Sequence, residues 1–299
     1  MKIRLLFFFI LFFLILAIIG SFNSIRCSSL SLKIFDDLLG FTGIESACKK
    51  SKNQKVIFKP EKFNNLDLKT EVICPKNSDI ILIIGQSNSA NNLLSSVDQS
   101  IKDINFNYLN NKCYQLSEPV LGATGNKYSF ASSLSAKLIN KDPIVFFTAG
   151  VNASSIKKWS NDKEISKEIN QSLKDLVKNN SLSFIIWVQG ESDAFKNIDY
   201  ISHFKQMRQI LLDGIDDSKL IDNKFIITQT SICNSKQDKI LTGNQKKLGM
   251  LFNDVIVTDI TDNLDNNYRY DGCHFNKFGT EAITNEISKI INKKFMIEQ

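Results

Sequence analysis

Five short apolar runs dominate the later part of the chain and limit what it can fold into. They are rich in β-branched and aromatic residues, and no polar residue alternates with the apolar ones. Continuous runs of this kind are typical of strands that are buried on both faces of a parallel sheet. The sequence therefore predicts strands at Ile80–Ile84, Ile144–Thr148, Phe184–Val188, Phe225–Thr228 and Val255–Thr258.

Helical patterns lie between and after these runs. Apolar residues recur at helical spacing in Tyr128–Ile139, Ile165–Val177, Ile198–Leu212 and Gly279–Ile291. Strands that alternate with helices predict right-handed crossovers and an α/β fold of three layers, α/β/α, around a five-stranded parallel sheet. In such sheets the ligand binds beyond the carboxyl ends of the strands, so the candidate residues are sought there.

The first residues predict export or membrane attachment. Leu5–Ile19 contains no polar side chain, and Lys2 and Arg4 precede it. An uncleaved membrane anchor through residues 5–22 and a cleaved signal peptide both fit this pattern. Either one places the rest of the chain outside the cytoplasm. We expect three parts: residues 1–22, a leader over 23–77, and a catalytic-type domain over 78–299.

Cysteine usage and charge agree with that location. Six cysteines without metal-ligand spacing fit an oxidising compartment, and we expect a disulfide among Cys48, Cys74 and Cys113 at the entry to the domain. Cys27 is the candidate for an unpaired thiol, whereas Cys273 suits packing or a disulfide. The formal charge of +6 is spread over single lysines, which excludes the clustered basic surface of a nucleic-acid-binding protein.

A serine follows the first predicted strand. In Gly85-Gln86-Ser87-Asn88, Ser87 either caps the next helix or serves as a nucleophile at the carboxyl edge of the sheet. A nucleophilic serine needs a base, and histidine is the usual one. The chain has two histidines, and His203 lies in an amphipathic helix that favours a structural role.

The other histidine lies after the fifth predicted strand. Asp271 precedes His274 by three residues, so one turn can bring its carboxylate to the imidazole and fix the tautomer. After the third strand comes a polar cluster, Gln189-Gly190-Glu191-Ser192-Asp193, which is either a capped turn or part of a site. The Gln189 amide could donate to an oxyanion there.

Together these motifs resemble the SGNH (GDSL-type) hydrolases, and more closely their carbohydrate and sialic acid-specific acetylesterase branch. The resemblance covers about residues 78–295 and rests on three blocks in order: Gly85-Gln86-Ser87-Asn88, Trp187-Val188-Gln189-Gly190-Glu191-Ser192-Asp193 and Asp271-Gly272-Cys273-His274-Phe275. It implies a flavodoxin-like sheet, no metal or organic cofactor, and a triad of Ser87, Asp271 and His274.

Two departures from that branch concern the oxyanion hole. Asn152 stands where the branch has a glycine whose N–H binds the oxyanion, and its own N–H could replace it. Simpler members of the family have an asparagine donor near Ser192, whereas here Gln189 is the preferred donor and Ser192 the alternative. The expected oxyanion hole is Ser87, Asn152 and Gln189, with Gln86, Glu191 and Ser192 as substrate-binding or supporting residues.

The sequence thus predicts a serine esterase that removes O-acetyl or other small acyl groups from carbohydrate. Three alternatives stay open at this point. An O-acyltransferase could use the same triad on a cell-surface glycan. A non-catalytic glycan-binding protein could share the fold. The chain could also be a membrane-anchored scaffold whose domain only projects from the surface.

Overall fold

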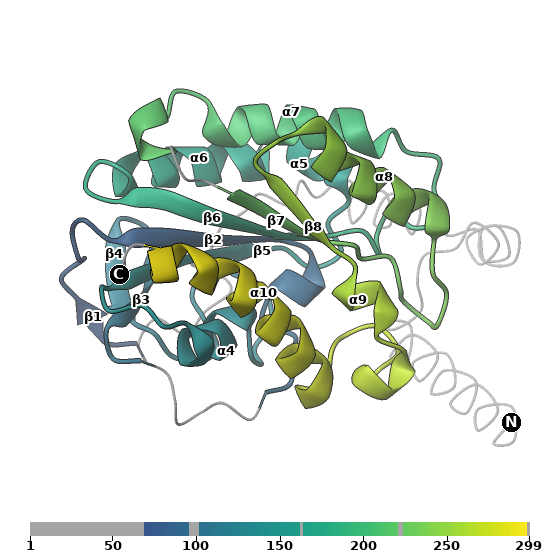
Figure 1. The fold of residues 1–299 in the computed structure, drawn as a ribbon, viewed down its shortest axis with the longest axis horizontal. Coiled ribbons are helices and arrows are strands. Elements are labelled where there is room, and N and C mark those ends of the chain that lie inside the picture. Colours follow the sequence, from purple (N-terminus) through teal and green to yellow (C-terminus); the bar gives the residue numbers. More distant parts are fainter. Residues whose placement is uncertain (1–68, 96–101, 162–163, 221–223, 298–299) are drawn as a thin grey trace, which may run out of the picture. The chain divides into compact units, whose positions relative to one another are not determined.

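The computed structural model describes residues 69–95, 102–161, 164–220 and 224–297. Eight strands form a single sheet in the order β1-β4-β3-β5-β2-β6-β7-β8 (Figure 1). Their bounds are β1 Glu71–Val72, β2 Asp79–Gly85, β3 Asn105–Leu109, β4 Lys112–Gln115, β5 Ile144–Gly150, β6 Ser181–Val188, β7 Lys224–Thr228 and β8 Val255–Thr258.

All five predicted strands are confirmed, as β2, β5, β6, β7 and β8, but the prediction of a five-stranded sheet is wrong. The strand β3 extends the parallel part beside β5, and β4 and β1 add an antiparallel edge. The run that forms β3 is interrupted by asparagines. Asn107 is buried, and its Oδ1 accepts a hydrogen bond of 2.6 Å from the N–H of Leu121, so its polarity hid a core strand.

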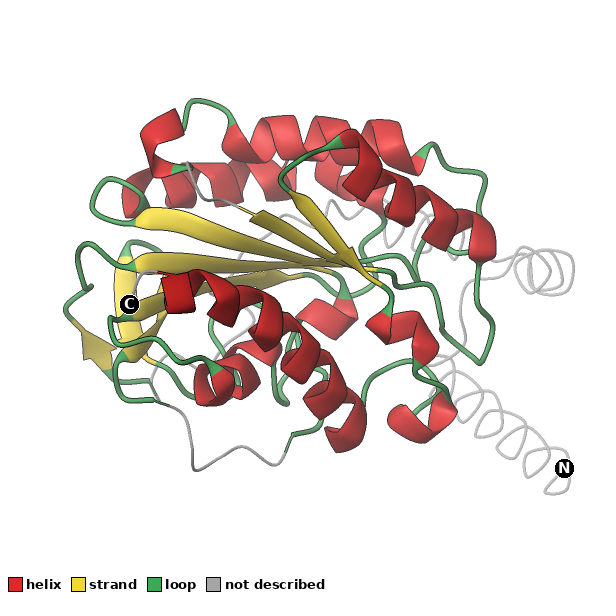
Figure 2. Ribbon diagram, viewed as in Figure 1, coloured by secondary structure: helices red, strands yellow, loops and turns green. Residues whose placement is uncertain are grey.

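Helices cover both faces of the sheet (Figure 2). One face carries α5 Ile156–Ser160, α6 Glu164–Leu176, α7 Tyr200–Leu212 and α8 Lys239–Leu251, and the other carries α4 Phe130–Lys137 and α10 Lys277–Ile297. Shorter elements are α9 Ile260–Asn263 and the 3-10 turns η4 Ser87–Ser89, η5 Asp217–Lys219 and η6 Asn266–Tyr268. The predicted helices correspond to α4, α6, α7 and α10.

The central strand shows why the predicted three layers form. Along β2, Ile80, Leu82 and Ile84 pack into the core beneath α5 to α8. The intervening Ile81 and Ile83 pack into the core shared with α4 and α10. A strand projects alternate side chains to opposite faces, so a continuous apolar run supplies two cores at once.

The ends of the strands approach one another too closely for side chains. A Cβ on Gly85, which has φ of +133°, would lie 2.1 Å from the carbonyl oxygen of Val188 at the end of β6. A Cβ on Gly190 would lie 1.6 Å from the carbonyl oxygen of Thr230, just after β7. Backbone-to-backbone contact therefore sets the spacing of the three loops that leave this edge.

A disulfide joins Cys74 to Cys113 on β4, which confirms the predicted staple; Cys27 and Cys48 lie outside the described residues. The strand β1 falls within the predicted leader, so the sheet begins before residue 78. Within the described ranges, no helix is long and apolar enough to cross a membrane. The predicted anchor or signal segment over residues 5–22 lies outside those ranges.

Candidate active site

Ser87 lies directly beyond the carboxyl end of β2, in the first position of η4. The turn is held from both sides: the N–H of Gln86 donates to the carbonyl of Val188 at 2.9 Å, and the N–H of Ala90 donates to the carbonyl of Ser87 at 3.1 Å. Asn92 Nδ2 also donates to the Ser87 carbonyl, at 3.1 Å. Ser87 is buried, with 7% of its surface exposed, and these bonds fix its backbone.

Asp271 and His274 form a compact pair after β8. His274 Nδ1 lies 2.7 Å from Asp271 Oδ2, and the backbone N–H of His274 donates to Asp271 Oδ1 at 2.7 Å. Partial burial works to raise the pKa of Asp271, but hydrogen bonds from the side chain and backbone of His274 and from the N–H of Cys273 hold it below the ordinary value. Asp271 is therefore an ionised carboxylate that orients the imidazole.

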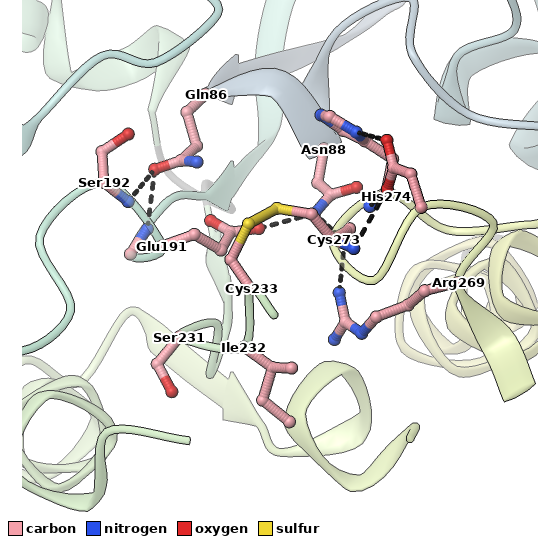
Figure 3. Close-up of a disulfide and its surroundings, with 12 residues drawn as sticks. Gln86, Asn88, Glu191, Ser192, Ser231, Ile232, Cys233, Arg269, Cys273 and His274 are labelled. Carbon is pink, nitrogen blue, oxygen red and sulfur yellow. Dashed lines mark hydrogen bonds and ion pairs between the residues drawn. A yellow bond between two sulfur atoms is a disulfide. The ribbon is translucent and has the colours of Figure 1, made fainter. Parts of the chain in front are cut away.

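Asn88 brings the serine turn and the histidine loop together (Figure 3). Its Nδ2 donates to the carbonyl of Cys273 at 3.2 Å, and its Oδ1 accepts from the N–H of Phe275 at 3.4 Å. The predicted triad residues therefore share one edge of the sheet. Asn88, the neighbour of Ser87, binds backbone groups on both sides of His274. Among the described residues, no hydrogen bond joins the Ser87 hydroxyl to His274.

Glu191 supports Asn88 from the loop after β6. Asn88 Nδ2 donates to Glu191 Oε1 at 2.5 Å, while Glu191 Oε2 is buried and has no hydrogen-bond partner in the structure. Burial raises the pKa of Glu191 to about 7, although the bond from Asn88 and the charge of Arg269 act in the opposite direction. The carboxyl group is thus poised between its neutral and ionised forms near neutral pH.

Gln86 ties the serine turn to the same loop. Its Oε1 accepts from the N–H of Ser192 at 2.9 Å and from the N–H of Gly190 at 3.4 Å, and the residue is buried. Gln86 therefore supports the loop rather than facing a substrate. Ser192, which is half-buried, is held through its backbone.

The structure does not place Gln189 where the predicted oxyanion donor would be. The residue is 0% exposed, and its Nε2 donates to Asp193 Oδ2 at 2.7 Å and to the carbonyl of Ser154 at 3.2 Å. Its Oε1 accepts from the hydroxyl of Tyr200 at 3.0 Å. Because both ends of the amide bind buried partners, Gln189 fixes the base of the loop.

Asn152 lies at the site, but its backbone differs from the expectation. Its N–H donates to Thr124 Oγ1 at 2.9 Å, so this N–H is already engaged within the protein. The left-handed residue of the loop is Ala153, with φ of +53°. The asparagine side chain is instead bound through Oδ1, at 2.7 Å, by Asn92 Nδ2.

Comparison with known proteins identifies the family. The family model described as "Carbohydrate esterase, sialic acid-specific acetylesterase" matches residues 77–292. The chain belongs to this family.

Among solved structures, a protein from Arabidopsis thaliana is similar with a TM-score of 0.57 and 16% identity, over 72% of this chain and 98% of the other. A carbohydrate acetylesterase from Sinorhizobium meliloti, Est24, has a TM-score of 0.43 and 9% identity, over 72% of this chain and 98% of the other. A comparison with curated proteins gives no match. The first of these likenesses concerns the fold alone, and the family makes the chain a carboxylic ester hydrolase.

The sequence did not reveal one feature of this esterase site. Cys273, between Asp271 and His274, forms a disulfide with Cys233 on the loop after β7 (Figure 3). The carbonyl of Cys273 also accepts from Arg269 Nη1 at 2.6 Å. The expectation of packing or a disulfide at Cys273 is confirmed, but fifteen pairings of six cysteines hid the partner.

Two further findings concern the second histidine and metal binding. His203 Nδ1 lies 2.8 Å from Ser160 Oγ and links α7 to α5, in line with the structural role expected for it. Within the described ranges, no three His, Cys, Asp or Glu side chains are grouped so that they could hold a metal ion.

Proposed function

We propose that this esterase removes O-acetyl or other small acyl groups from carbohydrate by a covalent mechanism in which Ser87 is the nucleophile. The observation that carries the proposal is the Asp271–His274 pair, 2.7 Å apart, on a loop that Asn88 binds directly to the turn of Ser87. A strand-end serine, an oriented imidazole and an ionised carboxylate partner are the parts that acyl transfer needs.

In the first half-reaction, Ser87 Oγ attacks the ester carbonyl carbon while His274 Nε2 takes the hydroxyl proton. The tetrahedral intermediate then expels the sugar oxygen, which receives that proton from His274 and leaves as a free hydroxyl. In the second half, His274 removes a proton from water as the water oxygen attacks the acyl carbon. Ser87 recovers its proton, and the acyl group leaves as a carboxylic acid.

Asp271 makes these proton transfers possible. Because its carboxylate binds the Nδ1 side of His274, the proton stays on Nδ1 and Nε2 is left as the base. The ionised carboxylate also stabilises the imidazolium that forms during attack. Catalytic hydrogen bonds are often absent without substrate, so the distance between Ser87 and His274 is expected to close when an ester binds.

The Ser87 N–H is the first donor to the oxyanion. Ser87 is the first residue of η4, where a backbone N–H has no partner within the helix. Gln189 is not part of this proposal because its amide is bound within the protein. Gln86 and Glu191 act on the position of the serine turn and on Asn88, and Ser192 holds the loop through its N–H.

Hydrolysis is the proposed outcome because water has access to the base. The side chains of His274 and Asp271 are 23% and 41% exposed, so solvent reaches the imidazole that would activate a water molecule. Both described disulfides support an extracytoplasmic location, since such bonds persist in oxidising compartments. The substrate is therefore sought among acetylated carbohydrates outside the cytoplasm.

The test is hydrolysis of p-nitrophenyl acetate and of acetylated oligosaccharides by the full chain, folded under oxidising conditions. We expect Ser87→Ala to lower kcat by about 10⁶-fold. Ser202→Ala, on an exposed position of α7, is the matched serine control and should retain the parent rate. Equal turnover by the parent and by Ser87→Ala would rule out the proposed nucleophile.

A further inference from the structure

The carboxamide of Asn152 has a defined orientation. Its Oδ1 accepts from Asn92 Nδ2 at 2.7 Å and from Thr124 Oγ1 at 2.7 Å. The same Asn92 nitrogen donates to the Ser87 carbonyl at 3.1 Å, and a carbonyl can only accept. The Asn92 amide is therefore fixed, and with it the side of the Asn152 amide that carries the oxygen.

With Oδ1 bound inward, Asn152 Nδ2 is left on the outer side of the loop. The residue is exposed, and no described residue accepts a hydrogen bond from this nitrogen. Asn92 Nδ2 contacts both Ser87 and Asn152, so the two residues flank one atom. The structure thus presents a side-chain amide donor beside the serine turn.

The backbone of Asn152 cannot easily serve the same purpose. Its N–H donates to Thr124 Oγ1 at 2.9 Å, and that hydroxyl lies 3.2 Å from the carbonyl of Gly150. Thr124 is buried, so its hydroxyl cannot move away from the N–H of Asn152 without breaking hydrogen bonds inside the protein. A donor from residue 152 to a bound ester would come from the side chain.

We infer that Asn152 Nδ2 donates a hydrogen bond to the carbonyl oxygen of the substrate's acyl group as that oxygen becomes negatively charged. This inference rests on the proposed function and names a second oxyanion donor besides the Ser87 N–H. An amide whose oxygen is already bound by two donors is held in place before the substrate arrives. Such preorganised donors stabilise a developing charge without a cost of reorganisation.

The test uses two variants that separate the side chain from the backbone. Asn152→Gly keeps the backbone N–H and removes the amide, whereas Asn152→Asp keeps an oxygen for Asn92 and Thr124 and removes the donor. We expect both to lower kcat for p-nitrophenyl acetate by about 10²-fold or more, with KM changed by less than about threefold. Asn179→Asp, at an exposed position before β6, is the matched control and should keep the parent rate.

Thermal unfolding and circular dichroism first establish that each variant is folded. If Asn152→Gly retains kcat within about threefold of the parent while Ser87→Ala is inactive, the inference is overturned and the esterase mechanism stands. If the folded parent has no hydrolysis that depends on Ser87, the proposed function falls and this inference falls with it. A loss in kcat for Asn152→Gly and Asn152→Asp, with Asn179→Asp unaffected, supports both.

Discussion

The Cys74–Cys113 and Cys233–Cys273 disulfides close loops of nearly the same length, with sequence separations of 39 and 40 residues. The first ties the antiparallel edge of the sheet, where Cys113 is a core residue of β4. The second lies within the Asp271–His274 loop, and the carbonyl of Cys273 accepts from Asn88 and Arg269.

In the chain-entropy model, what a disulfide contributes to stability depends on the length of the loop that it closes. The two bonds should therefore contribute similarly to folding. What a disulfide contributes to function depends instead on which atoms it holds in place. The comparison separates these two contributions within one molecule.

The largest expected difference is in activity. Replacing both Cys233 and Cys273 with alanine removes the covalent restraint on the Asp271–His274 loop, and we expect kcat/KM of the folded fraction to fall by about 10- to 100-fold. Replacing both Cys74 and Cys113 should leave kcat/KM within about twofold. Ester hydrolysis normalised to folded protein measures both, and equal losses in the two double variants would remove the distinction.

The stability of the two double variants should be alike. With loops of 39 and 40 residues, we expect each to lose about 4 kcal/mol in the free energy of unfolding. Urea unfolding followed by circular dichroism gives both values. A difference above about 2 kcal/mol would mean that local packing, rather than loop length, decides what each bond contributes.

A smaller effect concerns the carboxyl group beside the site. Burial raises the pKa of Glu191 to about 7, above its ordinary value near 4.5, so between these pH values the folded protein holds a proton that the unfolded chain releases. The stabilisation is fully present below pH 4.5 and is lost as pH rises through 7. Glu191→Gln cannot ionise, so relative to the parent it should gain stability from pH 4.5 to 8.

Unfolding titrations at several pH values measure this difference. Glu118 also has a pKa of about 7 because of burial, but it is present in both proteins and cancels in the comparison. Because the amide introduced by Glu191→Gln still offers an oxygen to Asn88, kcat at pH 6 should stay within about threefold of the parent. A parallel pH dependence in the two proteins would show that Glu191 ionises without cost.

The smallest effect is expected at the other disulfide. Lys112 Nζ lies 2.7 Å from Glu71 Oε2 across β4 and β1, with both side chains about half exposed. Exposed ion pairs of this kind contribute little. Lys112→Ala should leave both the midpoint of urea unfolding and kcat/KM unchanged within error, and a clear loss of activity would connect this edge of the sheet to the site.

The sequence predicted what local patterns encode. Continuous apolar runs gave β2, β5 and β6 because strands buried on both faces leave no polar position, whereas β3 was missed because Asn105 and Asn107 are buried among specific partners. Within the site, Asp271 and His274 meet within one turn, so their spacing was enough to suggest the pair.

Interactions between distant segments could not be read in the same way. The amide of Gln189 is bound by Tyr200 and by the carbonyl of Ser154, and the N–H of Asn152 by Thr124, so each is engaged through contacts that no local pattern records. The partner of Cys273 is separated from it by 40 residues. Whether a hydrogen-bond donor is free to bind a substrate can therefore be read only from the folded structure.

The close approach at Gly85 and Gly190 has a consequence for redesigning this enzyme. No side chain fits between these glycines and the carbonyl groups of Val188 and Thr230, so substitutions there would push the strand ends apart. Changes to this loop are better confined to its outer part, from Phe195 to Asn197, where Phe195 is 65% exposed. A mutant library confined to those positions would vary the exposed surface of the loop after β6 while the backbone contacts at Gly85 and Gly190 stay unchanged.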